Sequence, residues 1–133
     1  MTFHCLIVGS RTFEDYDLFQ NKVDHFLGGR TDVEMVSGGA AGADFLAERY
    51  ANDRGFPLQV FSPDWSRYGK RAGYVRNREM HEYISKFPER GVIAFWDGKS
   101  RGTAQSFRLA REFDNPLRAV RFDFSDRANA MVE

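Results

Sequence analysis

The sequence predicts an α/β fold, with a mostly parallel five-stranded sheet and helices packed on both of its faces. Short apolar runs alternate along the chain with longer segments whose apolar residues recur at helical spacing. This alternation favours parallel strands joined by right-handed crossover helices. A length of 133 residues fits a single domain, which we expect to span residues 1–133.

The first half of the chain alternates between strands and helices. Its first apolar run reads as a strand that is covered on both faces. The first predicted helix has an apolar stripe of Phe19, Val23, Phe26 and Leu27, and Gly28 follows it as a stop signal. The predicted strands here cover residues 3–8, 33–37 and 58–61, and the predicted helices cover residues 15–27 and about 43–54.

The second half repeats this alternation after a polar and aromatic loop. That loop is predicted over residues 62–73 and contains both tryptophan and tyrosine. The last residues, 124–133, are expected to form a loose tail. The remaining predicted elements are a helix over residues 74–87, a strand over 91–95, a loop over 96–103 leading into a helix that ends near residue 113, and a strand over 117–122.

Four loops rich in glycine or polar residues each follow a predicted strand. In a parallel sheet all of these loops lie beyond the carboxyl ends of the strands, where ligands bind at the point at which strand order reverses. The sequence therefore predicts that they share one edge of the sheet. They are residues 9–11, 37–44, 62–73 and 98–103.

The longest glycine-rich loop joins the second strand to the second helix. A helix start offers free backbone N–H groups and a positive dipole end, which together favour an anion. Glycine permits close approach of a phosphate and tolerates positive φ. We expect a phosphate or nucleotide here, and the alternative is an ordinary tight turn. The candidate ligand-binding residues are Ser37, Gly38, Gly39, Gly42 and Asp44.

Two other loops supply further candidates for ligand contact. Gly98, Ser100, Gly102 and Thr103 surround a second predicted helix start, where a hydroxyl group either binds the ligand or only caps the helix. The loop after the first strand contributes a glycine, a serine and an arginine. These are Gly9, Ser10 and Arg11.

Arg76 lies on the apolar face of the third long helix, together with Met80 and Ile84. A guanidinium group that points inward needs an anionic partner, because an unpaired buried charge is strongly unfavourable. The partner is either a ligand phosphate or a carboxylate, with Asp44 and Glu48 as candidates. The neighbouring Asn77 is a weaker polar candidate.

Asp44, Trp65 and Tyr68 each allow two interpretations. Asp44 contacts a ribose or acts as a general acid or base, or else it serves as a helix cap or ion-pair partner. Trp65 and Tyr68 either stack on a base or pack as a lid on the core. The spacing of the residues does not decide between these alternatives.

Composition bears on partners and location. Lys+Arg and Asp+Glu are equal at 19 each, so nucleic acid is not expected as a partner. No run is long enough to cross a bilayer, and Cys5, the single cysteine, is expected to be buried, so we predict a cytoplasmic protein. The three histidines have no ligand-like spacing, and neither a metal nor a cofactor is predicted. A homo-oligomer is expected.

Five motifs together resemble a known family, the YspA/YpsA-related branch of the SLOG superfamily. This Rossmann-like group also contains LOG-type nucleotide phosphoribohydrolases and DprA-like proteins, and the resemblance covers about residues 3–122. The motifs, in order, are Gly9-Ser10-Arg11-Thr12-Phe13, Ser37-Gly38-Gly39-Ala40-Ala41-Gly42-Ala43-Asp44, Asp64-Trp65-Ser66-Arg67-Tyr68-Gly69-Lys70, Arg76-Asn77-Arg78-Glu79-Met80 and Trp96-Asp97-Gly98-Lys99-Ser100-Arg101-Gly102-Thr103.

The resemblance implies a Rossmann-like three-layer domain that binds a nucleotide or nucleotide-derived small molecule as a sensor or ligand-binding module. LOG-type enzymes use an Arg-Lys-x-x-Met motif, which Arg76 and Met80 match, and a Gly-Gly-x-Gly-Thr-x-x-Glu motif. Ser106 stands where the second motif has its glutamate. If the chain is instead a hydrolase of N-glycosidic bonds, the candidate catalytic residues are Arg76, Asp44 and Glu79.

Overall fold

The protein, seen in a computed structural model that describes residues 1–122, forms one parallel five-stranded sheet. The strand order is β3-β2-β1-β4-β5, and all four strand pairings are parallel, which confirms the predicted α/β fold. The predicted tail, residues 124–133, lies outside the described residues. The strands are β1 (Phe3–Gly9), β2 (Val33–Ser37), β3 (Leu58–Val60), β4 (Arg90–Trp96) and β5 (Leu117–Arg121).

The first two helices end at glycines that the sequence marks as stop signals, and an aspartate caps the start of the first. The Asp15 side chain accepts a hydrogen bond from the Leu18 N–H (3.0 Å) at the start of α1, and Gly28 ends that helix in the left-handed region. Gly55 ends α2 in the same way. The helices are α1 (Tyr16–Leu27), α2 (Ala43–Arg54), α3 (Trp65–Tyr68), α4 (Ala72–Ser85) and α5 (Arg101–Glu112), with the 3-10 helix η1 (Gly69–Arg71) between α3 and α4.

The segment predicted as a loop over residues 62–73 is instead largely helical. It contains α3, η1 and the first residues of α4, which begins two residues before the predicted start. The Asp64 carboxylate accepts a hydrogen bond from the Arg67 N–H (3.1 Å) and so caps α3. The capping aspartate is a helix signal, and the glycines and aromatic residues that follow it concealed this signal in the sequence.

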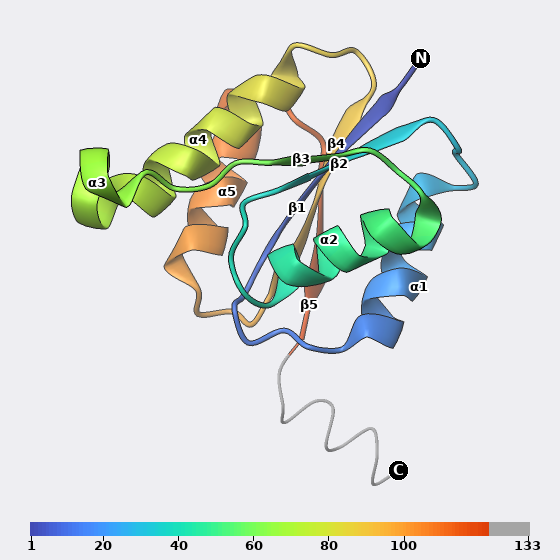
Figure 1. Cartoon of the computed structure of the whole chain (residues 1–133), viewed down its shortest axis with the longest axis horizontal. Helices are drawn as coiled ribbons and strands as arrows, with labels where there is room; N and C mark the ends of the chain where they lie inside the picture. Colours follow the sequence, from blue (N-terminus) through green and yellow to red (C-terminus); the bar gives the residue numbers. More distant parts are fainter. Residues whose placement is uncertain (123–133) are drawn as a thin grey trace, which may run out of the picture.

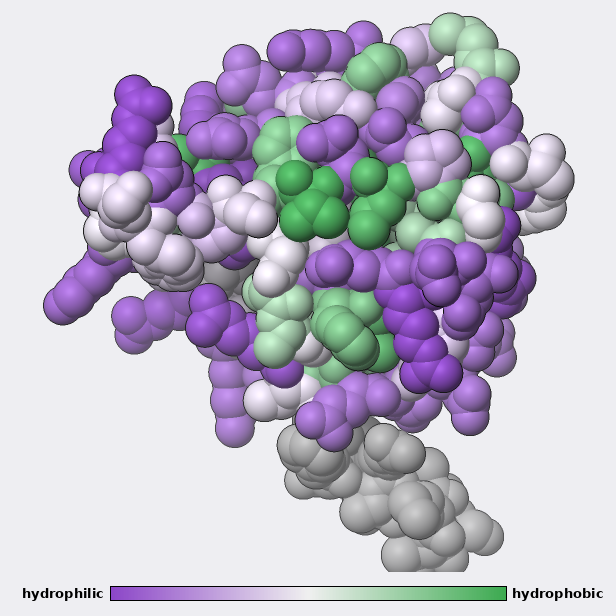
Figure 2. Space-filling model, in the orientation of Figure 1, coloured by the Kyte–Doolittle hydropathy of each residue, from purple (hydrophilic) through white to green (hydrophobic). Residues whose placement is uncertain are grey.

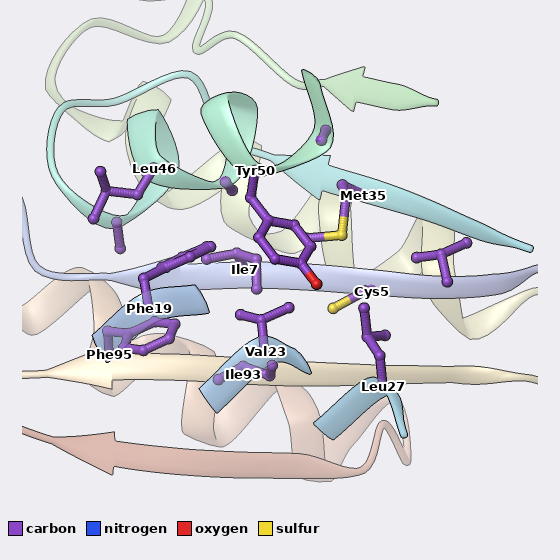
Figure 3. Close-up of a cluster of buried hydrophobic side chains, with 14 of the residues drawn as sticks. Cys5, Ile7, Phe19, Val23, Leu27, Met35, Leu46, Tyr50, Ile93 and Phe95 are labelled. Carbon is purple, nitrogen blue, oxygen red and sulfur yellow. The ribbon is translucent and has the colours of Figure 1, made fainter. Parts of the chain in front are cut away.

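Helices cover both faces of the sheet, with α1 and α2 on one side and α4 and α5 on the other (Figure 1). Alternate residues of β1 point to opposite faces, so that Cys5 and Ile7 join the core under α1 and α2, while Leu6 and Val8 pack under α4 and α5. Figure 3 shows the larger core, in which Phe19 of α1 and Tyr50 of α2 point toward the sheet.

The strand order places a reversal between β1 and β4. From β1 the chain proceeds outward to β2 and β3, and it then returns to the other side of β1 to form β4 and β5. The loops after β1 and β4 therefore diverge at the carboxyl ends of two adjacent strands, where an α/β sheet forms its binding crevice. None of the helices in residues 1–122 combines the length and the apolar character that crossing a membrane requires.

Candidate functional site

A cavity of about 400 Å³ opens at this reversal. It lies between the loop after β1, the start of α2, the α3–α4 segment and the start of α5. Segments that are far apart in the sequence therefore share one rim, as the sequence predicted. The predicted site residues that line the cavity are Gly9, Ser10, Arg11, Asp44, Arg76, Asn77, Ser100, Gly102 and Thr103.

Other predicted site residues lie outside the cavity lining. Ser37 is fully buried, and its hydroxyl group donates to the Asp44 carbonyl oxygen (3.2 Å). Glu79 lines a separate small depression on another side of α4, so the structure does not bring this candidate catalytic carboxylate to the cavity. The remaining predicted residues that do not line the cavity are Gly38, Gly39, Gly42 and Gly98.

Two glycines bring the loops after β1 and β2 into contact. A Cβ atom on Gly42, which has φ +77°, would collide with the Ser10 carbonyl oxygen and the Arg11 backbone. A Cβ atom on Gly9 would lie 2.6 Å from the Ala43 Cβ. The Ala43 N–H donates to the Ser10 carbonyl oxygen (3.3 Å). These glycines therefore serve the packing of one loop on another, rather than the approach of a ligand that we expected for Gly42.

Arg76 is buried at the base of the cavity, with 8% of its surface exposed. Its Nε donates to the Asn77 side-chain oxygen (2.9 Å), and its Nη1 donates to the Gly38 carbonyl oxygen. Burial lowers the pKa of this guanidinium, and the nearby Asp44 carboxylate opposes that shift. The inward orientation predicted for Arg76 is thus confirmed.

Asp44 is the second charged group at the base of the cavity. Burial raises its pKa to about 6, although the charge of Arg76 and a hydrogen bond from the Ala40 N–H (3.2 Å) both favour the ionised form. The neighbouring Glu48 raises the pKa further, and Arg11 lowers it. A carboxyl group that titrates this close to neutrality can exchange a proton with a bound ligand.

The loop after β4 is held together by its own side chains. The Asp97 carboxylate accepts hydrogen bonds from the N–H groups of Lys99 (2.8 Å) and Ser100 (2.9 Å). Burial alone would raise the pKa of Asp97, but these hydrogen bonds hold it below its usual value. Ser100 caps α5 by accepting from the Thr103 N–H (3.3 Å), so the capping role that we considered for this serine is observed.

The cavity also contains residues that our list of predicted site residues omitted. Trp65 and Tyr74 stand at its mouth with 53% and 44% of their surfaces exposed, so Trp65 does not pack as a lid on the core. Lys70 lines the same mouth. Ser106, one helical turn after Thr103 on α5, is fully buried, and its hydroxyl oxygen has no hydrogen-bond partner among the described residues. Ser106 lies three residues after Thr103, at the position where the LOG-type motif has its glutamate, and this position was the signal that could have found it.

A model of the YspA, cpYpsA-related SLOG family matches residues 4–68. The Gene 61 protein of Mycobacterium phage D29 is 32% identical to this chain over 118 residues, which are 84% of the chain and 91% of that protein. The chain belongs to the YspA, cpYpsA-related SLOG family. The predicted resemblance is therefore confirmed.

Solved structures extend the likeness of this SLOG-family chain to DNA processing protein A. The Helicobacter pylori protein, whose structure was described for its single-stranded DNA binding mode, matches with a TM-score of 0.67 at 20% identity, covering 92% of this chain and 66% of that one. The Streptococcus pneumoniae protein matches with a TM-score of 0.61 at 18% identity, covering 98% of this chain and 56% of that one. The chain thus spans less than two thirds of either protein.

This likeness corrects our expectation that nucleic acid is not a partner, because a protein of the same fold is described as binding single-stranded DNA. The expectation rested on equal totals of acidic and basic residues, and a total says nothing of where the charges lie. Residues 14–54, which include α1 and α2, contain nine acidic and four basic residues. By contrast, residues 65–78 and 98–111 contain no acidic residue, and their basic residues are Arg67, Lys70, Arg71, Arg76, Arg78, Lys99, Arg101, Arg108 and Arg111.

The basic segments cover α3, η1, the first half of α4 and most of α5, on the cavity side of the sheet. Figure 2 shows a largely hydrophilic surface at the α3 end of the molecule, while hydrophobic residues reach the surface nearer the centre of that view. We call these two segments, residues 65–78 and 98–111, the basic layer. Of its basic residues, Lys70 and Arg76 line the cavity, a concentration of positive charge that the zero net charge conceals.

Proposed function

We propose that this chain binds a nucleotide or nucleotide-derived molecule in the cavity at the β1–β4 reversal. The observation that carries the proposal is the pair of buried charges, Arg76 and Asp44, at the base of an open cavity. Buried charges are retained where a ligand or partner compensates for their lost hydration. The site on the sheet is also where α/β proteins bind nucleotides.

The residues that line the cavity suggest which part of the ligand each of them contacts. Arg11 and Lys70 stand at the mouth and supply positive charge for a phosphate. The start of α5, with the Ser100 and Thr103 hydroxyl groups on the cavity lining, is proposed as a further contact for the ligand. Trp65 offers an exposed aromatic ring for a base. The buried polar groups then face the sugar.

Titration calorimetry with AMP tests this proposal on Arg76. Arg76→Lys keeps the charge but loses the planar fork that bonds Gly38 and Asn77, and we expect it to weaken binding by about tenfold or more. Arg78→Ala is the matched control. Arg78 lies on the same helix, but it is exposed and pairs with Glu112 (2.7 Å) outside the cavity. Equal affinities of the two variants would contradict the proposal.

Hydrolysis of an N-glycosidic bond is the alternative use of the same cavity. The raised pKa of Asp44 favours it, because a carboxyl group that titrates near pH 6 can donate and accept a proton. Incubation with AMP, followed by chromatographic detection of free adenine, separates the two functions. Release of adenine that Asp44→Asn abolishes would establish hydrolysis. Binding of AMP without release would leave a ligand-binding module.

Binding of single-stranded nucleic acid is a second candidate function, and the basic layer favours it. Exposed Trp65 and Tyr74 lie within this layer, and a basic surface with exposed aromatic rings suits unstacked bases and their phosphates. Fluorescence anisotropy of a labelled oligothymidylate tests this function across a salt series. We expect binding that weakens steeply as salt is raised and that is reduced in a Trp65→Ala, Lys70→Ala variant. If neither the salt concentration nor the double substitution changes the affinity, the basic layer is not the surface that binds the oligonucleotide.

A further inference from the structure

The base of the cavity, where Asp44 and Arg76 meet over Gly38, has a hydrogen-bonding pattern that selects among ligand groups. A Cβ atom on Gly38 would lie 2.9 Å from Asp44 Oδ2 and 3.0 Å from Arg76 Cδ and Nε. Both side chains therefore pack directly against the backbone of Gly38. The Asp44 carboxylate and the Arg76 guanidinium do not form an ion pair within 4.0 Å among residues 1–122. Each nevertheless influences the pKa of the other.

Each of the two side chains retains one polar atom without a protein partner in the described residues. Asp44 Oδ2 accepts from the Ala40 N–H, and this leaves Oδ1. Arg76 uses Nε and Nη1 for Asn77 and Gly38, and this leaves Nη2, which lies close to Gly73 on the cavity wall. The two side chains thus offer one negatively charged hydrogen-bond acceptor and one positively charged hydrogen-bond donor.

A neutral group that both donates and accepts, such as a hydroxyl group, satisfies both of these atoms at once. A hydroxyl oxygen accepts from the guanidinium while its proton is donated to the carboxylate. A phosphate in the same place would face the Asp44 carboxylate, whose ionised form is favoured by the charge of Arg76 and by the hydrogen bond from the Ala40 N–H. An ammonium group would face Arg76. Like charges in a buried site are strongly unfavourable, so both of these groups are disfavoured here.

Three further residues complete a surface suited to a sugar ring. The Ser106 hydroxyl is fully buried, lines the cavity and lacks a partner among the described residues, so it can accept or donate a further hydrogen bond. Val8 and Met80, both buried, add apolar contact for the C–H groups of a ring. Phosphate is left to the exposed Arg11 and Lys70 at the mouth.

We propose that Asp44, Arg76 and Ser106 form a subsite for the ribose hydroxyls, so that the cavity selects ribonucleotides over 2′-deoxyribonucleotides. This inference rests on the proposed nucleotide-binding function and names the class of nucleotide. A ligand that lacks the hydroxyl leaves buried polar groups unpaired, which is the most effective way for a site to discriminate.

Calorimetric titration of the wild-type protein with two matched pairs of probes tests the inference. The first pair is ribose 5-phosphate and 2-deoxyribose 5-phosphate, which makes the result independent of any base, and the second is AMP and 2′-deoxy-AMP. We expect the ribose compound of each pair to bind about tenfold more tightly or better. Equal affinity within both pairs would overturn the ribose subsite and leave the nucleotide-binding function intact. The absence of binding by all four probes would overturn both.

Two carboxylate variants assign the selectivity to its residue. Asp44→Asn removes the charge with little change of shape, and we expect it to bring the ratio of ribose to deoxyribose affinity close to one. Glu48→Gln is the matched control, because Glu48 lies one turn further along α2, accepts from Ser37 and does not line the cavity. We expect this control to keep the wild-type ratio. An unchanged ratio in Asp44→Asn would overturn the role of Asp44.

Discussion

The two faces of the sheet differ in what they bury. Under α1 and α2 the core is almost entirely hydrophobic, and the rings of Phe19 and Phe95 stack with centroids 4.9 Å apart (Figure 3). Under α4 the buried residues include Arg76, Asn77 and His81. The comparison indicates a division of labour: the first face supplies most of the hydrophobic stabilisation, and the second, together with Asp44 at the start of α2, bears the polar groups of the candidate site.

The largest expected effect is on the hydrophobic face. Phe19→Ala removes a fully buried ring from α1 and should lower the free energy of unfolding by about 3 to 5 kcal/mol, as measured by urea denaturation. The folded fraction of this variant should bind AMP with wild-type affinity, because Phe19 does not line the cavity. A loss of affinity in the folded variant would mean that the two faces are not separable.

Asp44→Asn tests the polar face through pH. The pKa of Asp44 is raised to about 6 from an ordinary value of 3.8, so the folded state binds the additional proton, and wild-type stability falls as the pH rises through this window. At pH 7 to 8 we expect the variant to be more stable than the wild type, by up to about 2 to 3 kcal/mol. The difference should shrink as the pH falls toward 4. A difference that is constant with pH would contradict the buried, titrating carboxylate.

His81 changes the stability with pH in the opposite direction to Asp44, so the wild type and Asp44→Asn must be compared at each pH. Burial lowers its pKa to about 4 from an ordinary value of 6.5, so its contribution to stability is lost as the pH falls between these values. In the wild type the two residues partly cancel. Comparing the wild type with Asp44→Asn at each pH removes the contribution of His81, because both proteins contain it.

Gly42 tests the contact that joins the site to the hydrophobic face. Gly42→Ala would place a methyl group against Ser10 at a positive φ, and we expect a loss of about 2 kcal/mol in unfolding free energy together with weaker AMP binding. Gly28→Ala is the matched control: its φ is also positive, but no atom lies within 4 Å, so only about 1 kcal/mol should be lost. Equal losses would show that the loop contact is unimportant.

The smallest effect is expected at an exposed ion pair of the cavity-side face. Arg78→Ala breaks the contact with Glu112 on α5, and we expect its urea denaturation midpoint to stay close to that of the wild type, because both side chains are half exposed and solvent screens their charges. Its affinity for AMP should not change. A change in affinity as large as that of Arg76→Lys would mean that charge on α4, rather than the buried geometry, controls binding.

Periodicity and punctuation predicted most of the fold. All five strands and the four long helices follow from apolar runs, helical spacing and stop signals such as Gly28 and Gly55. The helical character of residues 65–71 was missed because Gly69 and the surrounding polar residues are typical of a loop. There, a local capping interaction at Asp64 overrode the composition of the segment.

The candidate site was predictable in part, for a physical reason. A residue that follows a parallel strand must lie at the carboxyl edge, so Ser10, Asp44 and Ser100 could be placed there from the sequence. The part played by Gly42 depends on which loop packs against which, and a single sequence does not contain that contact. The basic layer was likewise overlooked, because its positive charge and the negative charge of the α1 and α2 region cancel in the total. The fold places these two regions on opposite sides of the sheet.

Backbone amide chemical shifts, followed by NMR while AMP is titrated into the 133-residue protein, test the central claim most directly. The account predicts that the perturbed amides cluster at residues 9–11, at Ala40 and Asp44, around Arg76 and at residues 100–103, which are distant in sequence and meet at one cavity. Perturbations confined to α1 and the opposite edge of the sheet, or none at saturating AMP, would contradict it.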